Sequence, residues 1–386
     1  MPMPLPRTRR SALLLIMGAS TALPFAVSAS TDVPLTSAAW DISHGNATFQ
    51  TREAFPGGLM QVTSESEEGY VTLKSADFAD GTIEFDIKPV TDEFPGLRFR
   101  QGPDGSADMV YIRVGPDCPA SHDCLQYLPL IHGRIPWDMY PQYQAPAPIR
   151  VDTWNHIRVV ISGERMSVYV NREATPSLQV AHLAGDNAHG TIAFEGKALY
   201  ANVTLAPDVI DGLATRVEPD TAASNANYLT EWEIAEPRPL AQPGEATFSA
   251  RPSSGWRPLH AEDAGLVNLA RIYPPIPREA PRQYAWLRTS IQADRDETRH
   301  MQVGFLREIT VFVNGQPAFQ GKNLYNVPGG RQAPDGRLDL ANGGFDIKLR
   351  KGRNDIVVAI NANTPDMRGR YGWGLKMKLD GSAPAP

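Results

Sequence analysis

Short segments of alternating apolar and polar residues recur along this chain and constrain its fold more than any other feature. Successive side chains of a strand point to opposite faces, so such alternation over about 4 to 8 residues is typical of half-buried β-strands. Helical periodicity is nearly absent, and 34 prolines and 32 glycines supply turns between the segments. In the first half the segments are 81–88, 96–100, 109–114, 156–161, 166–170, 190–194 and 201–205. In the second half they are 228–234, 283–291, 308–313, 345–349, 355–360 and 373–379. The sequence therefore predicts an all-β protein built from sandwiches or jelly rolls.

The length of 386 residues predicts two domains, because a single core rarely grows beyond about 250–300 residues. The small, polar and acidic stretch 208–226 has the composition of a linker. We therefore expect two β-sandwiches in tandem, at 30–207 and 227–381, and a disordered tail at 382–386. Within the second sandwich, Asn314-Gly315 predicts a tight hairpin, because both residues tolerate positive φ.

Residues 1–29 have the features of a cleaved signal peptide. Arg7, Arg9 and Arg10 precede an apolar run, and small residues end at Ala29. The arginine pair partly matches the twin-arginine pattern, so both Sec and twin-arginine export stay open. No later segment has the roughly 20 apolar residues of a membrane span. We expect a periplasmic or secreted bacterial protein without a membrane span in the mature chain.

Residues 35–207 resemble a known fold family. The run from Trp154 to Asn171, the segments 190–194 and 201–205, and the opening 78–88 are similar to a concanavalin A-like or laminin-G-like jelly roll. The resemblance is a pattern of strands and turns, so it implies the fold more than the function.

The second region resembles a different module. The pair 309–321 and 349–360 is similar to a galactose-binding-like jelly roll, which bacterial polysaccharide enzymes carry as an accessory domain. The resemblance implies sugar binding in some members and scaffolding in others.

Cys118 and Cys124, the only two cysteines, lie in one loop-like stretch. In an exported chain this arrangement predicts a local disulfide. A metal site helped by His122 and Asp123 is the alternative, but two thiolates and one imidazole fall short of a closed zinc site.

Metal sites otherwise have little support, and we make no confident metal or cofactor assignment. The two resemblances allow a structural Ca²⁺, for which Asp104, Asp108 and Asp117 are candidates by residue type alone. No spacing typical of a catalytic metal site occurs among the eight histidines.

The stretch 125–145 is the strongest candidate for ligand binding. Sugars are recognised by flat aromatic faces together with planar polar groups, and this proline-interrupted stretch offers both. Alternatively, these aromatic residues cover the edge of the sandwich and plug its core. The candidate residues are Tyr127, His132, Arg134, Trp137, Asp138, Tyr140 and Tyr143.

Alternating arginines form a second candidate feature. Arg98 and Arg100, and Arg113 beside Tyr111, are expected to place several guanidinium groups on one sheet face. Such a face suits an anionic sugar, because arginine binds carboxylates in bidentate fashion. A plain exposed face, balanced by the carboxylates of Glu84, Asp86 and Asp92, is the alternative.

Enzyme signatures are weak. Glu84 and Asp86 alternate on one strand, but the second glutamate of a glucanase strand is missing at position 88. We therefore expect an exported carbohydrate-binding protein without chemistry of its own. A glycan hydrolase, with His132, Asp138 and Glu195 as weak catalytic candidates, is the first alternative, and a protein-interaction module of the envelope is the second. The net charge of −6 disfavours nucleic acid as a partner.

Overall fold

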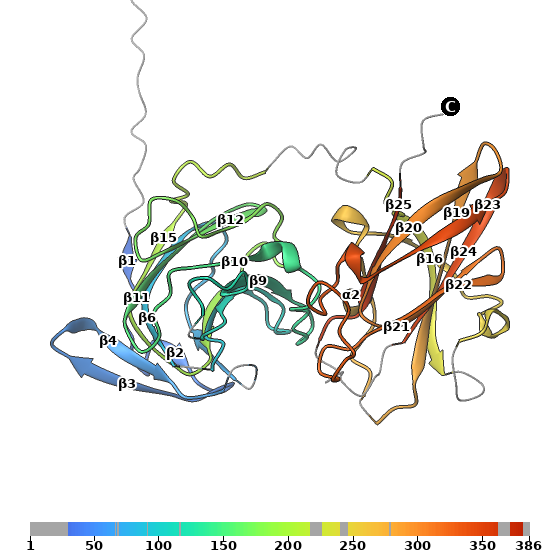
Figure 1. The fold of residues 1–386 in the computed structure, drawn as a ribbon. Coiled ribbons are helices and arrows are strands. Elements are labelled where there is room, and N and C mark those ends of the chain that lie inside the picture. Colours follow the sequence, from blue (N-terminus) through green and yellow to red (C-terminus); the bar gives the residue numbers. More distant parts are fainter. Residues whose placement is uncertain are drawn as a thin grey trace, which may run out of the picture.

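The structure is a computed structural model that describes residues 30–65, 67, 69–90, 92–115, 117–216, 226–239, 246–277, 279–361 and 371–380. The expected signal peptide (1–29), the expected tail (382–386) and residues 217–225 of the expected linker lie outside the described residues. None of the helices in the described ranges has the length and apolar character needed to cross a membrane. Two β-sandwiches lie side by side (Figure 1).

The first sandwich consists of an eight-stranded and a seven-stranded antiparallel sheet. The eight-stranded sheet contains β13 (Leu178–Val180), β12 (Arg165–Val170), β11 (Asn155–Ser162), β6 (Gly81–Pro89), β15 (Ala198–Pro207), β4 (Phe55–Val62) and β3 (Ala47–Arg52) in this order, with β1 (Thr31–Asp32) also paired to β15. The seven-stranded sheet contains β10 (Gln144–Ala145), β9 (Leu125–Leu130), β8 (Ala107–Ile112), β7 (Gly96–Gln101), β14 (Thr191–Glu195), β5 (Tyr70–Leu73) and β2 (Trp40–Asp41).

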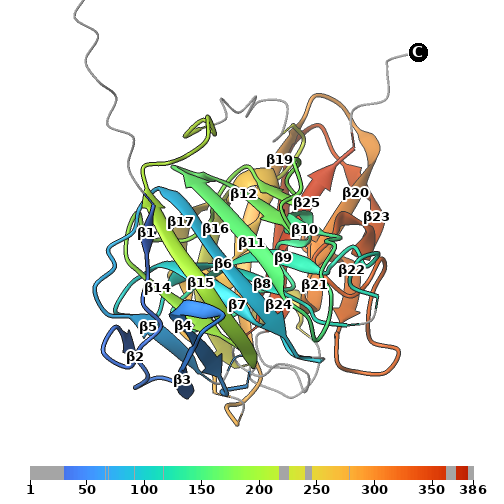
Figure 2. The same ribbon diagram turned by 90° about the vertical axis from the view of Figure 1, so that its left-hand side faces the viewer.

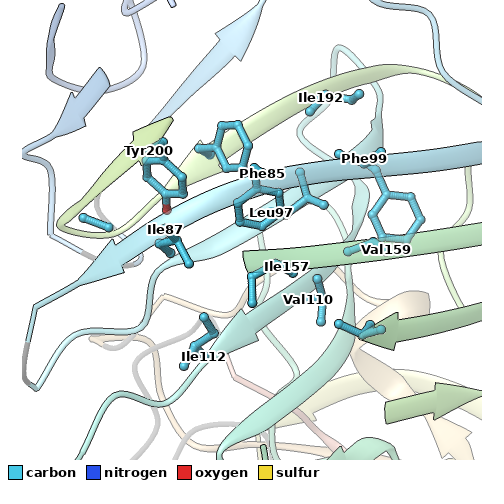
Figure 3. Close-up of a cluster of buried hydrophobic side chains, with 14 of the residues drawn as sticks. Phe85, Ile87, Leu97, Phe99, Val110, Ile112, Ile157, Val159, Ile192 and Tyr200 are labelled. Atoms are coloured by element: carbon cyan, nitrogen blue, oxygen red, sulfur yellow. The ribbon is translucent and has the colours of Figure 1, made fainter. Parts of the chain in front are cut away.

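Alternation along the strands builds the core between these two sheets. In β6, Ile83, Phe85 and Ile87 are buried, whereas Glu84 and Asp86 are partly exposed. Figure 3 shows Phe85 and Ile87 beside side chains from the opposite sheet, such as Leu97. The solvated face of β6 agrees with the simple interpretation of Glu84 and Asp86, which both lie close to His156.

The second sandwich packs a six-stranded sheet against a four-stranded sheet. The larger sheet contains β17 (Arg257–His260), β16 (Glu231–Pro239), β19 (Gln283–Ala293), β24 (Gly352–Asn361), β21 (Arg307–Val313) and β22 (Gln316–Asn323). The smaller sheet contains β18 (Val267–Asn268), β25 (Gly374–Leu379), β20 (Glu297–Phe305) and β23 (Gly343–Leu349). The predicted hairpin at Asn314-Gly315 is confirmed: it joins β21 to β22, and both residues have positive φ.

Helices are few and short in the described ranges, so the all-β prediction is confirmed. They are η1 (Pro141–Tyr143), η2 (Phe248–Ala250), η3 (Asp263–Gly265), α2 (Leu269–Ile272) and η4 (Leu340–Asn342). Each predicted strand segment overlaps an observed strand. The disulfide between Cys118 and Cys124 is also confirmed, with a Cα–Cα distance of 4.7 Å.

The first part of the expected linker lies along the first sandwich. The Thr82 hydroxyl donates to the carbonyl of Val209, and the Glu164 N–H donates to the carbonyl of Thr215. Residues 208–216 therefore continue the first sandwich.

The seven-stranded sheet faces the second sandwich, whereas the eight-stranded sheet faces away from it. In Figure 1, β9 and β10 lie next to the second sandwich and β6, β11 and β15 lie on the far side. Figure 2 looks onto that far side, with β15, β6 and β11 in front of β7 and β8. The surface between the sandwiches is therefore built on the seven-stranded sheet.

Candidate binding site

The candidate site lies on the face of the seven-stranded sheet that points away from the first core. Along β8, Val110 and Ile112 belong to that core, so Met109 and Tyr111 lie on the opposite face. Most side chains of this face on β7, β8, β9 and β14 are exposed to solvent by less than one tenth. They are Arg98, Ala107, Met109, Tyr111, Gln126, Leu128, Leu130, Ala193 and Glu195. The second sandwich and the loop after β9 therefore cover this part of the sheet.

A buried ion pair fixes the second sandwich to this face. Nη2 of Arg307 lies 3.0 Å from Oδ2 of Asp138, and each side chain is only 1% exposed. Gly372 completes the group: its N–H donates to Oδ1 of Asp138 at 2.9 Å, and its carbonyl accepts from Arg307 at 2.9 Å. A charge buried in this way depends on its partner, so the pair ties the two sandwiches together.

Further contacts surround this ion pair. Nη2 of Arg337 in the second sandwich donates to Oδ2 of Asp123 at 2.7 Å. On another side, Asn268 donates to the hydroxyl of Tyr140 at 3.0 Å. An apolar cluster fills the space between the sandwiches and consists of Met139, Tyr140, Leu266, Leu306 and Leu338.

A pocket of about 160 Å³ remains within this junction. The first sandwich supplies Glu67, Phe94, Met109, Tyr111, Arg113, Ile135, Trp137 and Glu195, and the second supplies Tyr325, Asn326 and Tyr371. A cavity of about 150 Å³ accommodates benzene, so the pocket has room for one six-membered ring. Rings meet edge to face along its wall, with Trp137 and Tyr325 centred 4.5 Å apart.

A hydrogen-bond network orients the polar side of the pocket. The Tyr111 hydroxyl donates to Oε1 of Gln126 at 2.6 Å, and Nη2 of Arg113 donates to the same oxygen at 3.0 Å. Gln126 in turn donates to the carbonyl of Trp137 at 2.6 Å. The guanidinium carbon of Arg113 lies 5.3 Å from the ring centre of Phe94 and 5.7 Å from that of Trp137. Arg113 is therefore held in one orientation among aromatic rings.

Two carboxylates reach the pocket from different strands and loops. Glu195, at the end of β14, is 1% exposed and accepts from Nε of Arg98 at 2.6 Å. Arg98 lies over the ring of Tyr70 at 4.2 Å. Glu67 lies in the loop after β4 and accepts from the Tyr371 hydroxyl at 3.4 Å. Both carboxylates can accept hydrogen bonds from a polar ligand.

The structure brings four of the predicted residues into this pocket: Tyr111, Arg113, Trp137 and Glu195. Arg98 lies behind them as the partner of Glu195. Tyr127 of the 125–145 stretch serves the packing. Tyr127 is fully buried in the first core, where its hydroxyl donates to Asp108 at 2.6 Å.

Four further candidates lie away from the pocket. Asp138 and Tyr140 are buried between the sandwiches. The half-buried Tyr143 accepts a hydrogen bond from the His182 N–H, and the exposed His132 lies 3.3 Å from Asp104. For Asp138, Tyr140 and Tyr143, the alternative that these residues plug and cover the sandwich describes the observed contacts, whereas the exposed His132 does neither.

Arg134 is also buried between the sandwiches. Its Nη2 donates to the carbonyl of Tyr273 at 3.0 Å, and the side chain is 1% exposed. Burial lowers the pKa of Arg134 to about 10.

Arg100 does not share a face with Arg98, contrary to the expectation from alternation. The pairing of β7 with β14 is interrupted by a bulge, and Arg100 has a positive φ of 52°. A bulge inserts one extra residue into the strand, so the side chains after it point to the side of the sheet opposite to the one that plain alternation predicts. Arg100 therefore turns to the end of the sandwich, where it binds Asp80 at 2.7 Å and the carbonyls of Ala79 and Gly163.

None of the residues that the second sandwich contributes to the pocket was predicted from the sequence. Tyr325, Asn326 and Tyr371 lie in loops of the second sandwich, and no local pattern relates them to β8 or β9. Phe94 and Glu67 also lie in loops. An aromatic residue in a loop next to a predicted strand, as at Phe94, was the only available signal.

The acidic residues considered for Ca²⁺ do not form a site. Asp108 is buried and accepts from the Tyr127 hydroxyl and the Gly185 N–H, whereas Asp104 accepts from Ser106 in its own turn. Among the described residues, no group of three or more histidine, cysteine, aspartate or glutamate side chains is arranged to hold a metal ion.

No family model and no curated protein matches the chain. Among solved structures, the chain is similar to the carbohydrate binding module CBM66 from Bacillus subtilis, with 18% identity, 43% of this chain and 93% of that chain covered, and a TM-score of 0.31. A Bacillus subtilis protein of unknown function with a galectin-like fold has 12% identity, coverages of 46% and 94%, and a TM-score of 0.33. The chain is also similar to the exoplasmic/lumenal domain of VIP36, bound to Ca²⁺ and Man3GlcNAc. The identity is 11%, 46% of this chain and 86% of that chain are covered, and the TM-score is 0.31.

Proposed function

We propose that this protein binds carbohydrate and that the pocket between the two sandwiches is its binding site. The observation that carries the proposal is the composition of the pocket: five aromatic side chains surround a ring-sized space that two carboxylates, one guanidinium and one amide also reach. Aromatic rings pack against the apolar face of a pyranose, and fixed polar groups recognise its hydroxyls.

The charges around the pocket favour a neutral sugar over the anionic alternative. Arg98 is paired with Glu195, and Arg113 lies 3.1 Å from Asp123. Arg337 is paired with both Asp123 and Asp335. Each of these guanidinium groups thus already has a carboxylate partner, so a second carboxylate from a uronic acid would gain little. Sugar hydroxyls, by contrast, can donate to Glu67 and Glu195.

We expect specific binding to neutral glycans when the full chain is screened on an array of neutral and acidic glycans. Phe94→Ala removes a half-buried aromatic wall and is expected to weaken that binding about tenfold, a loss of about 1.4 kcal/mol. Trp154→Ala is the matched control, because Trp154 is 36% exposed and packs on Phe55 outside the pocket. Absence of binding to every glycan, or equal loss in both variants, contradicts the proposal.

A hydrolase is the second candidate, because Glu67 and Glu195 reach the same pocket. In glycoside hydrolysis one carboxylic acid protonates the leaving oxygen, while the other carboxylate takes a proton from the attacking water. This candidate predicts that a bound glycan is shortened and that Glu67→Gln stops the shortening but keeps binding within a few-fold. Reducing-end release, measured by chromatography, is the test. Binding without release leaves the protein a lectin-like module.

We also propose that binding takes place outside the cytoplasm. The arginine-rich, apolar segment 1–29 supports export, and the disulfide between Cys118 and Cys124 is typical of oxidising compartments. The location of an epitope-tagged chain after cell fractionation tests this proposal.

A further inference from the structure

The residues that line the pocket divide into a buried group and a more accessible group. The buried group consists of residues exposed by less than one tenth: Met109, Tyr111, Ile135, Trp137, Glu195 and Tyr371. The accessible group consists of the half-buried Glu67, Phe94, Arg113 and Tyr325 and the exposed Asn326. A ligand can therefore enter past the accessible residues and reach the buried ones, which we call the floor.

The loop after β9 and Tyr371 of the second sandwich close the sheet face beyond the pocket. Leu128 and Leu130 of β9 and Met109 of β8 pack with Trp137 and Tyr371, and each of the three is at most 2% exposed. A sheet face that is buried in this way cannot hold a polymer lying along it. The ion pair between Asp138 and Arg307 and the contact between Asp123 and Arg337 keep this cover in place.

We infer that the pocket accepts only the terminal unit of a glycan chain, and that Tyr325, Asn326 and Tyr371 of the second sandwich enforce this selectivity. The inference rests on the proposed binding of carbohydrate. The space of about 160 Å³ holds one ring. The floor blocks a second unit beyond that ring, so the rest of the chain must leave past Asn326. The second sandwich thus helps to exclude a second sugar unit from the pocket and provides part of the specificity of the site.

Calorimetric stoichiometry against chain length tests this inference. The probes are size-fractionated short and long oligomers of the neutral glycan that binds best on the array. We expect the number of protein molecules bound per glycan chain to stay constant as the chain lengthens, because the number of ends does not change. A number that rises in proportion to length shows binding to chain interiors and overturns the inference, while the proposed function stands. No heat and no array signal with any glycan overturns the proposed function itself.

Variants of the second sandwich test its part in the site. Tyr325→Ala is expected to lower the affinity for the single monosaccharide unit about tenfold, although Tyr325 lies outside the jelly roll that carries most of the pocket. Tyr228→Ala is the control, because Tyr228 lies in the same sandwich but not at the pocket, where it contacts Lys378. Thermal unfolding of both variants establishes that they are folded. Unchanged affinity in a folded Tyr325→Ala protein contradicts the role of the second sandwich.

Discussion

Asp138→Ala is expected to lower the free energy of unfolding of the full chain by about 3–5 kcal/mol, because it leaves the buried Arg307 without its carboxylate. The two side chains are each 1% exposed, so water cannot replace the lost partner. The substitution also removes the acceptor of the Gly372 N–H. Equilibrium unfolding in urea, followed by tryptophan fluorescence, measures the change.

Two comparisons make this result specific to the buried pair. Glu236→Ala breaks an exposed ion pair with Arg257 in the second sandwich. It is expected to change the free energy of unfolding by no more than about 0.5 kcal/mol. The double variant Asp138→Leu with Arg307→Met removes both charges and is expected to recover more than half of the loss. A loss below about 1 kcal/mol for Asp138→Ala means that the pair is solvated in solution, and therefore that the sandwiches separate there.

Asp108→Asn is expected to stabilise the protein, and to do so more at pH 7 than at pH 4. Burial raises the pKa of the Asp108 carboxyl from 3.8 to about 6, although the Tyr127 hydroxyl and the Gly185 N–H bind it. The stabilisation from this group is fully present below the unfolded value of 3.8 and is lost as the pH rises through the folded value of about 6. A difference of about two pKa units corresponds to about 3 kcal/mol.

Asparagine has nearly the same shape as the neutral carboxylic acid, and its side chain does not titrate in this pH range. The difference in unfolding free energy between the variant and the wild-type protein is therefore expected to grow by about 2–3 kcal/mol from pH 4 to pH 7. Taking the difference cancels the other titrating carboxylates, which are common to both proteins. A difference that is the same at both pH values shows that Asp108 ionises as readily in the folded state as in the unfolded state.

Strands were predicted well because their signal is local. Segments such as 81–88 alternate on their own, and each side chain needs only to face the core or the solvent. Strand β9 was missed, since Pro129 suggested an irregular stretch. Strand β10 pairs with β9 only at Leu125 and Gln126, so at Pro129 β9 has no partner strand on that side. An edge position of this kind tolerates the missing N–H of proline.

The candidate site was predicted only in part, for two physical reasons. The side of the sheet to which a side chain of β7 points depends on a bulge in the pairing with β14. No residue near Arg100 indicates this bulge in the sequence. Tyr371 and Tyr325 meet Trp137 through the packing of two separate cores, and the sequence contains no signal for such long-range contacts. The sequence drew attention to the aromatic residues of 125–145, but it could not separate Trp137, which lines the pocket, from Tyr140, which is buried between the sandwiches.

The covered face of the seven-stranded sheet limits how modular this chain can be. Tandem sandwiches are commonly exchanged between proteins as independent pieces, which requires each piece to have a soluble surface of its own. Here Met139, Leu306 and Leu338, which pack together between the sandwiches, would lose this contact as soon as the second sandwich left. Exposed apolar patches of this kind promote aggregation. We therefore expect that neither sandwich folds well without the other, and that substitutions on one side of their junction restrict those on the other.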